Sequence, residues 1–221
     1  MIRCSSISKI MTEPRGKKER DAGEWSETAK SAMLEQAREQ LFNVRKNIDD
    51  VDCIKKGKAC EDDGVELYNN VFLFDLKKLP ADSRRDNGII TGEPDIIATG
   101  SNKGVDIKCS WSLLTFPLTE EMAAKKEYEW QARGYMCLFD VDVWEIAYCM
   151  IDTPDDLLKP WHNIEEHRID PSIPLHHRIT IARYERDKEE EKRMLEKCAK
   201  ANEWIDQAVK EFATNHDQYI K

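Results

Sequence analysis

The sequence predicts a mixed α/β domain with a central sheet flanked by helices. Two observations lead to this class: short apolar segments with strand-like residues fill the middle of the 221-residue chain, and stretches with helical periodicity surround them. A chain of this length is sufficient for one domain with its own core. We therefore expect a flexible basic arm over residues 1–22 and a single domain over residues 23–221.

Four segments have helical character. Residues 26–47 carry apolar side chains at spacings of three and four, and a second helix is expected from about residue 58 to 70. Residues 119–139 begin with Thr119 as an N-cap, followed by two glutamates that favour the first turn of a helix. The last 35 residues predict a long C-terminal helix whose apolar stripe consists of Met194, Cys198, Ala201, Ile205, Ala208 and Phe212.

The strands are expected between these helices. The segments GIIT (88–91), PDIIAT (94–99) and VDIKCS (105–110) follow one another, and the turn GSNKG between the last two is typical of a hairpin loop. Residues 143–152 and 178–184 read as two further strands. The element order of two helices, three strands, a helix, a strand, a long excursion, a strand and a helix fits a mixed sheet.

Composition limits the location and the partners of the protein. Lysine and arginine total 34 against 43 acidic residues, a balance that does not indicate a nucleic-acid binder, although a local basic groove can coexist with an acidic exterior. The apolar run 146–151 is far shorter than the roughly 20 residues of a membrane span. The N-terminus lacks a secretory signal, and the seven scattered cysteines form no CxxC pair, so we expect a cytoplasmic protein without a membrane partner.

The predicted hairpin contains charges that a core strand does not normally carry. Asp106 and Lys108 flank Ile107 and share one face of their strand, and Asp95 on the adjoining strand can approach Asp106. Two carboxylates at close range repel unless one is protonated or a cation lies between them. Mg²⁺, for which Mn²⁺ substitutes, suits such oxygen ligands together with the backbone carbonyl of Ile107, and Lys108 is placed to orient or deprotonate water. A surface strand with an ordinary ion pair is the alternative.

Two further patterns support a site at the hairpin. Gln131 and Tyr135 lie four apart on one helix face, where Gln131 can bind a phosphate or water and Tyr135 can reach the strand ends. Gly57 and Glu61 are also four apart, and Glu61 can complete a metal shell. The alternatives are a core tyrosine in an amphipathic helix and an acidic surface around Glu61, where Glu66 competes for the same role.

The order Glu61, Pro94-Asp95, Asp106-Ile107-Lys108 and Gln131-x-x-x-Tyr135 resembles the motifs of PD-(D/E)xK nucleases, most closely the phage lambda-exonuclease, YqaJ and RecB-nuclease branch. The resemblance implies a restriction-endonuclease-like core and metal-dependent cleavage of DNA. Its metal ligands would be Asp95, Asp106 and the Ile107 carbonyl, with Glu61 as a further metal or water contact. Lys108 would activate water, and Gln131 and Tyr135 would support the site. Because the cysteines are dispersed, we expect no iron–sulfur cluster.

Several side chains are candidates for DNA contacts. Cations are needed against phosphates, and aromatic rings can stack on bases or fill the core. The candidate cations are Arg84, Arg85, Lys103, Lys125, Lys126 and the basic residues 15–20 of the arm, and the candidate rings are Trp111 and Phe116. We interpret the histidines at 162, 167, 176 and 177 as loop or DNA-side surface.

Two functions are compatible with these patterns. One is a phage-encoded, Mg²⁺-dependent exonuclease that processes double-stranded DNA ends in recombination or repair. The other is a DNA-binding or assembly module that keeps the fold without cutting. The intact set of Asp95, Asp106 and Lys108 favours the enzyme. The resemblance also suggests a single-strand annealing protein as partner and a ring-shaped homotrimer.

Overall fold

The structure is a computed structural model that describes residues 1–45, 47, 50–80 and 82–217. Its centre is a mixed four-stranded sheet in which the outer pairs are antiparallel and the two middle strands run parallel. In spatial order its strands are β4 (Ile96–Ala98), β5 (Lys103–Cys109), β6 (Val143–Cys149) and β7 (Ile179–Glu185). The predicted mixed α/β class and the hairpin between β4 and β5 are confirmed.

A smaller sheet corrects the prediction of one sheet and of a loose N-terminal arm. Strand β3 (Ile90–Gly92) pairs with β2 (Arg85–Asp86) and, in parallel, with β1 (Ile2–Arg3). Ile2, Ile7 and Ile10 are each at most 1% exposed, so the first residues belong to the main core. They continue through η1 (Cys4–Ser6) and α1 (Ile7–Ile10), and only α2 (Lys17–Asp21) keeps the exposed character expected of the arm.

The helices agree with the predictions in place but differ in their ends. They are α3 (Glu27–Phe42), α4 (Asp52–Ala59), α5 (Glu61–Phe72), α6 (Glu120–Ala123), α7 (Lys126–Phe139) and α8 (Lys188–Asp217). Asn43 adopts a left-handed conformation and ends α3, so the predicted helix over 26–47 is too long, and residue 46 lies outside the described residues. Thr119 caps α6 as expected, but extended backbone at Lys125 separates α6 from α7.

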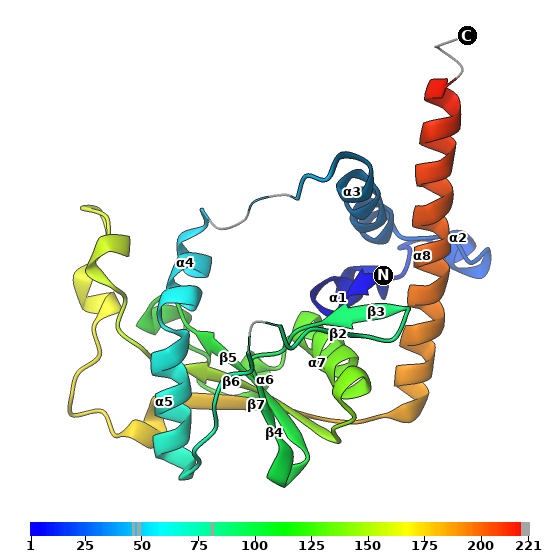
Figure 1. Cartoon of the computed structure of the whole chain (residues 1–221). Coiled ribbons are helices and arrows are strands. Elements are labelled where there is room, and N and C mark those ends of the chain that lie inside the picture. Colours follow the sequence, from blue (N-terminus) through cyan, green and yellow to red (C-terminus); the bar gives the residue numbers. More distant parts are fainter. Residues whose placement is uncertain (46, 48–49, 81, 218–221) are drawn as a thin grey trace.

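The remaining turns are short 3₁₀ segments. They are η2 (Thr99–Ser101), η3 (Leu113–Thr115), η4 (Asp155–Leu157), η5 (Ile164–His167) and η6 (Leu175–His177). The last three belong to the excursion between β6 and β7, which Figure 1 shows beside α4. No helix in the described part of the chain is long and apolar enough to cross a membrane.

The four-stranded sheet has a core on each face. Val105 and Ile107 pack with α5 residues such as Tyr68, whereas Trp144 and Ile146 pack into the larger core with α7 and α8. Figure 1 shows α4 and α5 on one side of the molecule and α3 and α8 on the other. Because side chains alternate along a strand, the odd positions of β5 face α5, and Asp106 and Lys108 lie on the α7 face.

The long helix α8 closes the larger core. The predicted stripe is confirmed over Met194, Cys198, Ala201 and Ile205, each at most 1% exposed. Farther along, the Phe212 ring contacts Phe42 of α3 edge-on, with 5.7 Å between centroids. The predicted continuation of the helix over residues 218–221 lies outside the described residues.

Candidate active site

The two strand carboxylates converge, as the sequence predicted. Residue 96 pairs with 105 across β4 and β5, so one further step of the register brings Asp95 opposite Asp106. Asp95 Oδ2 accepts a hydrogen bond from the Ile107 amide at 3.0 Å, which fixes the carboxyl against β5. Asp106 is 2% exposed and lies beneath it on the same face.

This pairing changes the proton affinity of Asp95. Burial and the nearby charge of Asp106 raise the pKa of Asp95 to about 8, although Lys108 acts in the opposite direction. At neutral pH, Asp95 therefore carries a proton in much of the population when no cation lies between the two carboxyls. The carboxyls of Asp95 and Asp106 thus need more positive charge than their surroundings supply. Such an imbalance is typical of a site that a bound cation completes.

Lys108 supplies part of the missing charge. Its Nζ lies 2.5 Å from Asp106 Oδ2, yet that oxygen accepts no well-aligned hydrogen bond and is buried. Burial alone would lower the pKa of Lys108, but Asp106 and Asp95 outweigh that effect and raise it. The ammonium therefore keeps its proton in the metal-free site.

Glu61 reaches the same region from the first residue of α5. Its charge contributes to the raised pKa of Asp95, and it forms an ion pair with Lys78 at 2.8 Å. Gly64, one turn later, permits this approach, because a Cβ at that position would lie 2.5 Å from Ile107 Cγ2. Glu61 thus lines the same cleft as Asp95, and its role as a metal ligand stays a prediction.

Gln131 and Tyr135 are paired on α7 behind the carboxyls. Gln131 Nε2 donates to the Tyr135 hydroxyl at 3.1 Å, and that hydroxyl donates to the Glu93 carbonyl at 3.2 Å. Burial, followed by the charge of Asp106, raises the pKa of Tyr135. Tyr135 thus fixes the chain two residues before Asp95, and Gly92 leaves room for its ring, since a Cβ there would lie 2.7 Å from it.

A cleft of about 720 Å³ opens over this cluster. Asp95, Lys108 and Glu61 line it, together with two tyrosines that the sequence reasoning missed, Tyr128 and Tyr148. Tyr128 lies one helical turn before Gln131, and its ring centroid is 5.5 Å from Lys108 Nζ. Tyr148 has an even number in β6 and pairs with Lys108 in the parallel register, so its side chain lies on the same face of the sheet as Lys108. This position in the strand is the signal that could have identified Tyr148.

The residues present fit a hard divalent cation. The donors are carboxylate oxygens, and one of them, Asp106 Oδ2, is buried and accepts no well-aligned hydrogen bond, with the Lys108 ammonium 2.5 Å away as its ion-pair partner. Among the described residues, no three His, Cys, Asp or Glu side chains are close enough to enclose a metal. Mg²⁺ retains several waters and is commonly bound through one or two carboxylates, so Asp95 and Asp106 are the side chains that would hold it. Both the metal and the expected lack of an iron–sulfur cluster stay predictions.

The structure separates the candidate DNA contacts. Lys125 lines the cleft, with its Nζ 5.7 Å from the Tyr148 ring centroid. Lys103 does not belong there: its odd position places it on the α5 face, where it bonds Glu145 at 3.0 Å and the Tyr68 hydroxyl at 2.7 Å. Lys103 therefore lies outside the cleft lining, and its role in DNA binding stays a prediction.

The other candidate cations lie outside the cleft lining. Arg84 pairs with Glu93 at 3.0 Å, and the Arg85 guanidinium lies 4.5 Å from the Phe139 ring centroid. Lys126 is exposed at the first position of α7. Their roles in DNA binding stay predictions.

The two candidate rings have different environments. Phe116 is 7% exposed and packs in the core, whereas Trp111 is half-buried and lines the cleft. His167, expected on the surface, is 4% exposed, and its ring centroid lies 5.0 Å from that of Trp111. The histidine is buried because its Nδ1 has partners in Thr153 Oγ1 and the Trp111 carbonyl.

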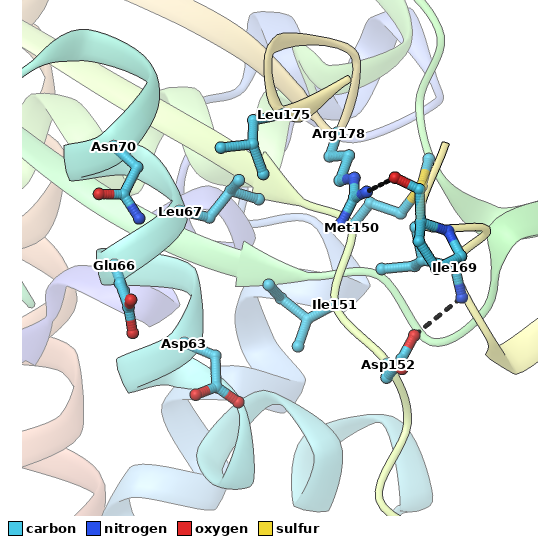
Figure 2. Close-up of a pocket in the computed structure, with 11 residues that line it drawn as sticks. Asp63, Glu66, Leu67, Asn70, Met150, Ile151, Asp152, Ile169, Leu175 and Arg178 are labelled. Carbon is cyan, nitrogen blue, oxygen red and sulfur yellow. Dashed lines mark hydrogen bonds between the residues drawn. The ribbon is translucent and has the colours of Figure 1, made fainter. Parts of the chain in front are cut away.

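A second pocket of about 440 Å³ lies away from the predicted site residues. Figure 2 shows Asp63 and Glu66 on α5 on one side and Ile169 on the other, with Leu67 and Ile151 between them. Glu66, the alternative to Glu61, lines this pocket, whereas Asp95, Lys108 and Glu61 line the cleft over β5.

The fold is similar to solved structures of exonucleases. Two structures of LHK-Exo, an alkaline exonuclease from Laribacter hongkongensis, one of them in complex with dAMP, have TM-scores of 0.72 and 0.71. Each is 13% identical and covers 99% of this chain and 94% of that chain, a likeness that shows the shared fold. No protein-family model and no curated protein sequence matches the chain.

A nearer relative defines the family. The phage-related exonuclease of Haemophilus somnus 129PT is 33% identical, covers 96% of both chains and has a TM-score of 0.85. The chain belongs to the family of this phage-related exonuclease. This membership supports the predicted place in the lambda-exonuclease and YqaJ branch and a nuclease function.

Proposed function

We propose that the protein is a metal-dependent exonuclease of the PD-(D/E)xK type that hydrolyses phosphodiester bonds at DNA ends. The observation that carries this function is the convergence of Asp95 and Asp106 with Lys108 at the base of an open cleft. Family membership with a phage-related exonuclease supports the same function.

The metal would be Mg²⁺ or Mn²⁺, held by Asp95, Asp106 and the Ile107 carbonyl, with Glu61 nearby. When bound, the cation supplies positive charge against phosphate oxygens and acidifies water. Hydrolysis forms a bond from a water oxygen to phosphorus and breaks the bond to one sugar oxygen, leaving a phosphate end and a hydroxyl end.

The protein groups have separate tasks in this reaction. The Lys108 ammonium keeps its proton against Asp106, so it donates a hydrogen bond to water or to a phosphate oxygen and stabilises negative charge in the transition state. Tyr135 holds the Glu93 carbonyl and thereby the position of Asp95. Lys125 at the cleft contacts the DNA backbone.

The test is the digestion of linear and circular plasmid with Mg²⁺ or with EDTA. We expect metal-dependent loss of linear DNA, intact circles and no activity in Asp106→Asn, whereas the exposed Asp142→Asn serves as a charge-matched control with full activity. Nicked circles would indicate an endonuclease. Retained DNA binding without cleavage under any cation would indicate a binding or assembly module.

The biological setting belongs to the same proposal. We infer a phage-encoded role in recombination or repair, with double-stranded ends as substrate, a single-strand annealing protein as partner and a ring-shaped homotrimer as the assembly. Light scattering of the purified chain tests the trimer, and a monomer at all concentrations would contradict it.

A further inference from the structure

Three large apolar side chains are exposed at one edge of the catalytic cleft. Leu114 is 77% exposed, Trp161 76% and Ile164 61%. Leu114 belongs to η3 and Ile164 to η5, two turns that contact each other. We call these three residues the Trp161 ridge. Large apolar side chains grouped at the edge of a cleft mark an interaction site more often than singly scattered ones do.

The ridge is connected to the cleft by aromatic contacts. The His162 ring lies between two tryptophans, 5.5 Å from Trp111 and 6.0 Å from Trp161 between centroids. Trp111 and Thr115, on either side of the start of η3, both line the cleft. The ridge therefore continues the cleft wall outward.

Buried polar groups hold this wall in place. The Trp111 carbonyl accepts hydrogen bonds from Lys56 Nζ at 3.1 Å and Thr153 Oγ1 at 3.0 Å, and His167 Nδ1 lies 3.1 Å from it. Lys56, Thr153 and His167 are at most 4% exposed. Burying a lysine costs free energy unless its ammonium has a hydrogen-bond partner. Because Lys56 donates to the backbone carbonyl of Trp111, we infer that this contact fixes the position of Trp111.

The excursion is fixed a second time at Lys159, between Thr153 and His167 along the chain. Lys159 Nζ forms an ion pair with Asp52 at 2.5 Å at the start of α4, and the next two residues, Cys53 and Ile54, line the cleft. Trp161 is thus exposed on a segment that is attached to the cleft on both sides. Such a ring needs little reordering to receive a flat ligand.

The charges around the ridge select the ligand. Lys159 Nζ lies 5.7 Å from the Trp161 ring centroid but is already paired with Asp52, and Glu165 is exposed beside Ile164. The ridge therefore favours bases over phosphates, while the backbone of a nucleic acid follows Lys108 and Lys125 in the cleft. Base faces are accessible in unpaired nucleotides and stack on aromatic rings regardless of sequence.

We propose that the Trp161 ridge is a stacking surface for unpaired nucleotides of the DNA strand whose end lies in the cleft. The inference rests on the proposed nuclease function for the identity of the ligand. It assigns Trp161 the largest contact, and Leu114 and Ile164 extend the apolar surface on one side.

The test is binding of a labelled oligothymidylate of about ten nucleotides in EDTA, followed by fluorescence anisotropy at several salt concentrations. We expect Trp161→Ala to weaken binding about 5- to 150-fold, the loss equivalent to one stacked base. The dependence of log Kd on log salt should not change, because stacking releases no counterions. Trp161→Phe should retain most of the affinity.

Controls separate this inference from the nuclease proposal. Leu175→Ala, 48% exposed at the pocket of Figure 2, should bind as the parent does. Hydrolysis of a small aryl phosphodiester, which has no base to stack, should be equal in the parent and Trp161→Ala. Unchanged DNA affinity, a smaller salt slope or impaired small-substrate hydrolysis in Trp161→Ala would overturn the stacking surface. A parent protein that cuts nothing with Mg²⁺ or Mn²⁺ overturns the nuclease function, while binding in EDTA still tests the ridge.

Discussion

Replacing Lys108 by methionine tests the charge balance of the site through stability as well as activity. The variant keeps the length of the side chain but removes the ammonium that lies 2.5 Å from Asp106 Oδ2, a carboxylate whose side chain is 3% exposed. Breaking a buried ion pair costs about 3–5 kcal/mol, and the 29% exposure of Lys108 favours the lower end. For a chain of this size, about 3 kcal/mol corresponds to a decrease in Tm of roughly 6–12 °C.

The cation dependence of this loss is the informative part. In the parent, a divalent cation shares the carboxylates with the Lys108 ammonium, whereas in Lys108→Met it is the only positive charge available to them. Mg²⁺ should therefore raise the Tm of the variant more than that of the parent, because stabilisation by a ligand grows with its affinity for the folded state. Differential scanning calorimetry in EDTA and in Mg²⁺ measures both shifts, and DNA cleavage should fall by at least about 100-fold.

The same strand offers a matched control. Lys103 also forms a buried ion pair, with Glu145 at 3.0 Å, but on the opposite face of the sheet. Lys103→Met should lose a similar amount of stability in EDTA and respond to Mg²⁺ as the parent does. If Mg²⁺ shifts the Tm of both variants equally, Asp95 and Asp106 do not form the cation site and the reasoning fails.

Three further outcomes are expected. Lys125→Ala should weaken DNA binding for all sequences and reduce the salt slope by about 1, as titrations at several salt concentrations will show, and an unchanged slope argues against a phosphate contact. Tyr135→Phe loses the bond to the Glu93 carbonyl, so urea denaturation should show a loss of about 1 kcal/mol together with reduced turnover, and parental turnover would remove its positioning role. Gly64→Ala places a Cβ 2.5 Å from Ile107 Cγ2, and this overpacking should lower the free energy of unfolding by about 1–3 kcal/mol in urea denaturation. The loss should be partly relieved in the double variant with Ile107→Leu, because leucine has no Cγ2. If the effects of the two substitutions simply add, the clash is contradicted.

The hairpin was predictable because local rules determine it. Alternation along β5 and the short turn before it set both the register and the face of each side chain, so Asp95, Asp106 and Lys108 could be brought together from sequence. The same alternation, applied to Lys103, places it on the other face. The alternation thus separates Lys103 from the face that carries Asp106 and Lys108.

The N-terminal segment illustrates what sequence alone did not reveal. Residue 2 pairs with residue 90 in parallel, and Arg3 forms an ion pair with Glu39 at 2.7 Å. The basic composition of the segment suggested a loose arm, but the burial of Ile7 and Ile10 is decided by partners far along the chain. Strand pairing between residues so far apart in the chain produces no local sequence pattern, apart from the spacing of the apolar residues in the segment.

The environment of the cleft also depended on tertiary structure. Tyr128 and Tyr148 come from α7 and β6, and they meet only because the parallel register places Lys108 beside Tyr148. A periodicity argument assigns both tyrosines to a core, and Tyr148 is indeed buried, whereas Tyr128 is partly buried. Periodicity does not show the neighbouring Lys108 ammonium, which gives the two rings a role in the cleft.

Strand β5 reconciles stability with chemistry by separating them onto its two faces. Val105 and Ile107 contribute to the core against α5, and the close packing at Gly64 holds that side rigidly. Asp106 and Lys108 on the other face leave a charge imbalance that folding does not resolve, since burial and the charge of Asp106 raise the pKa of Asp95 to about 8. A site of this design is assembled by the fold and completed by its ligand, so substitutions on the odd face should change stability first, and those on the even face should change the response to metal first.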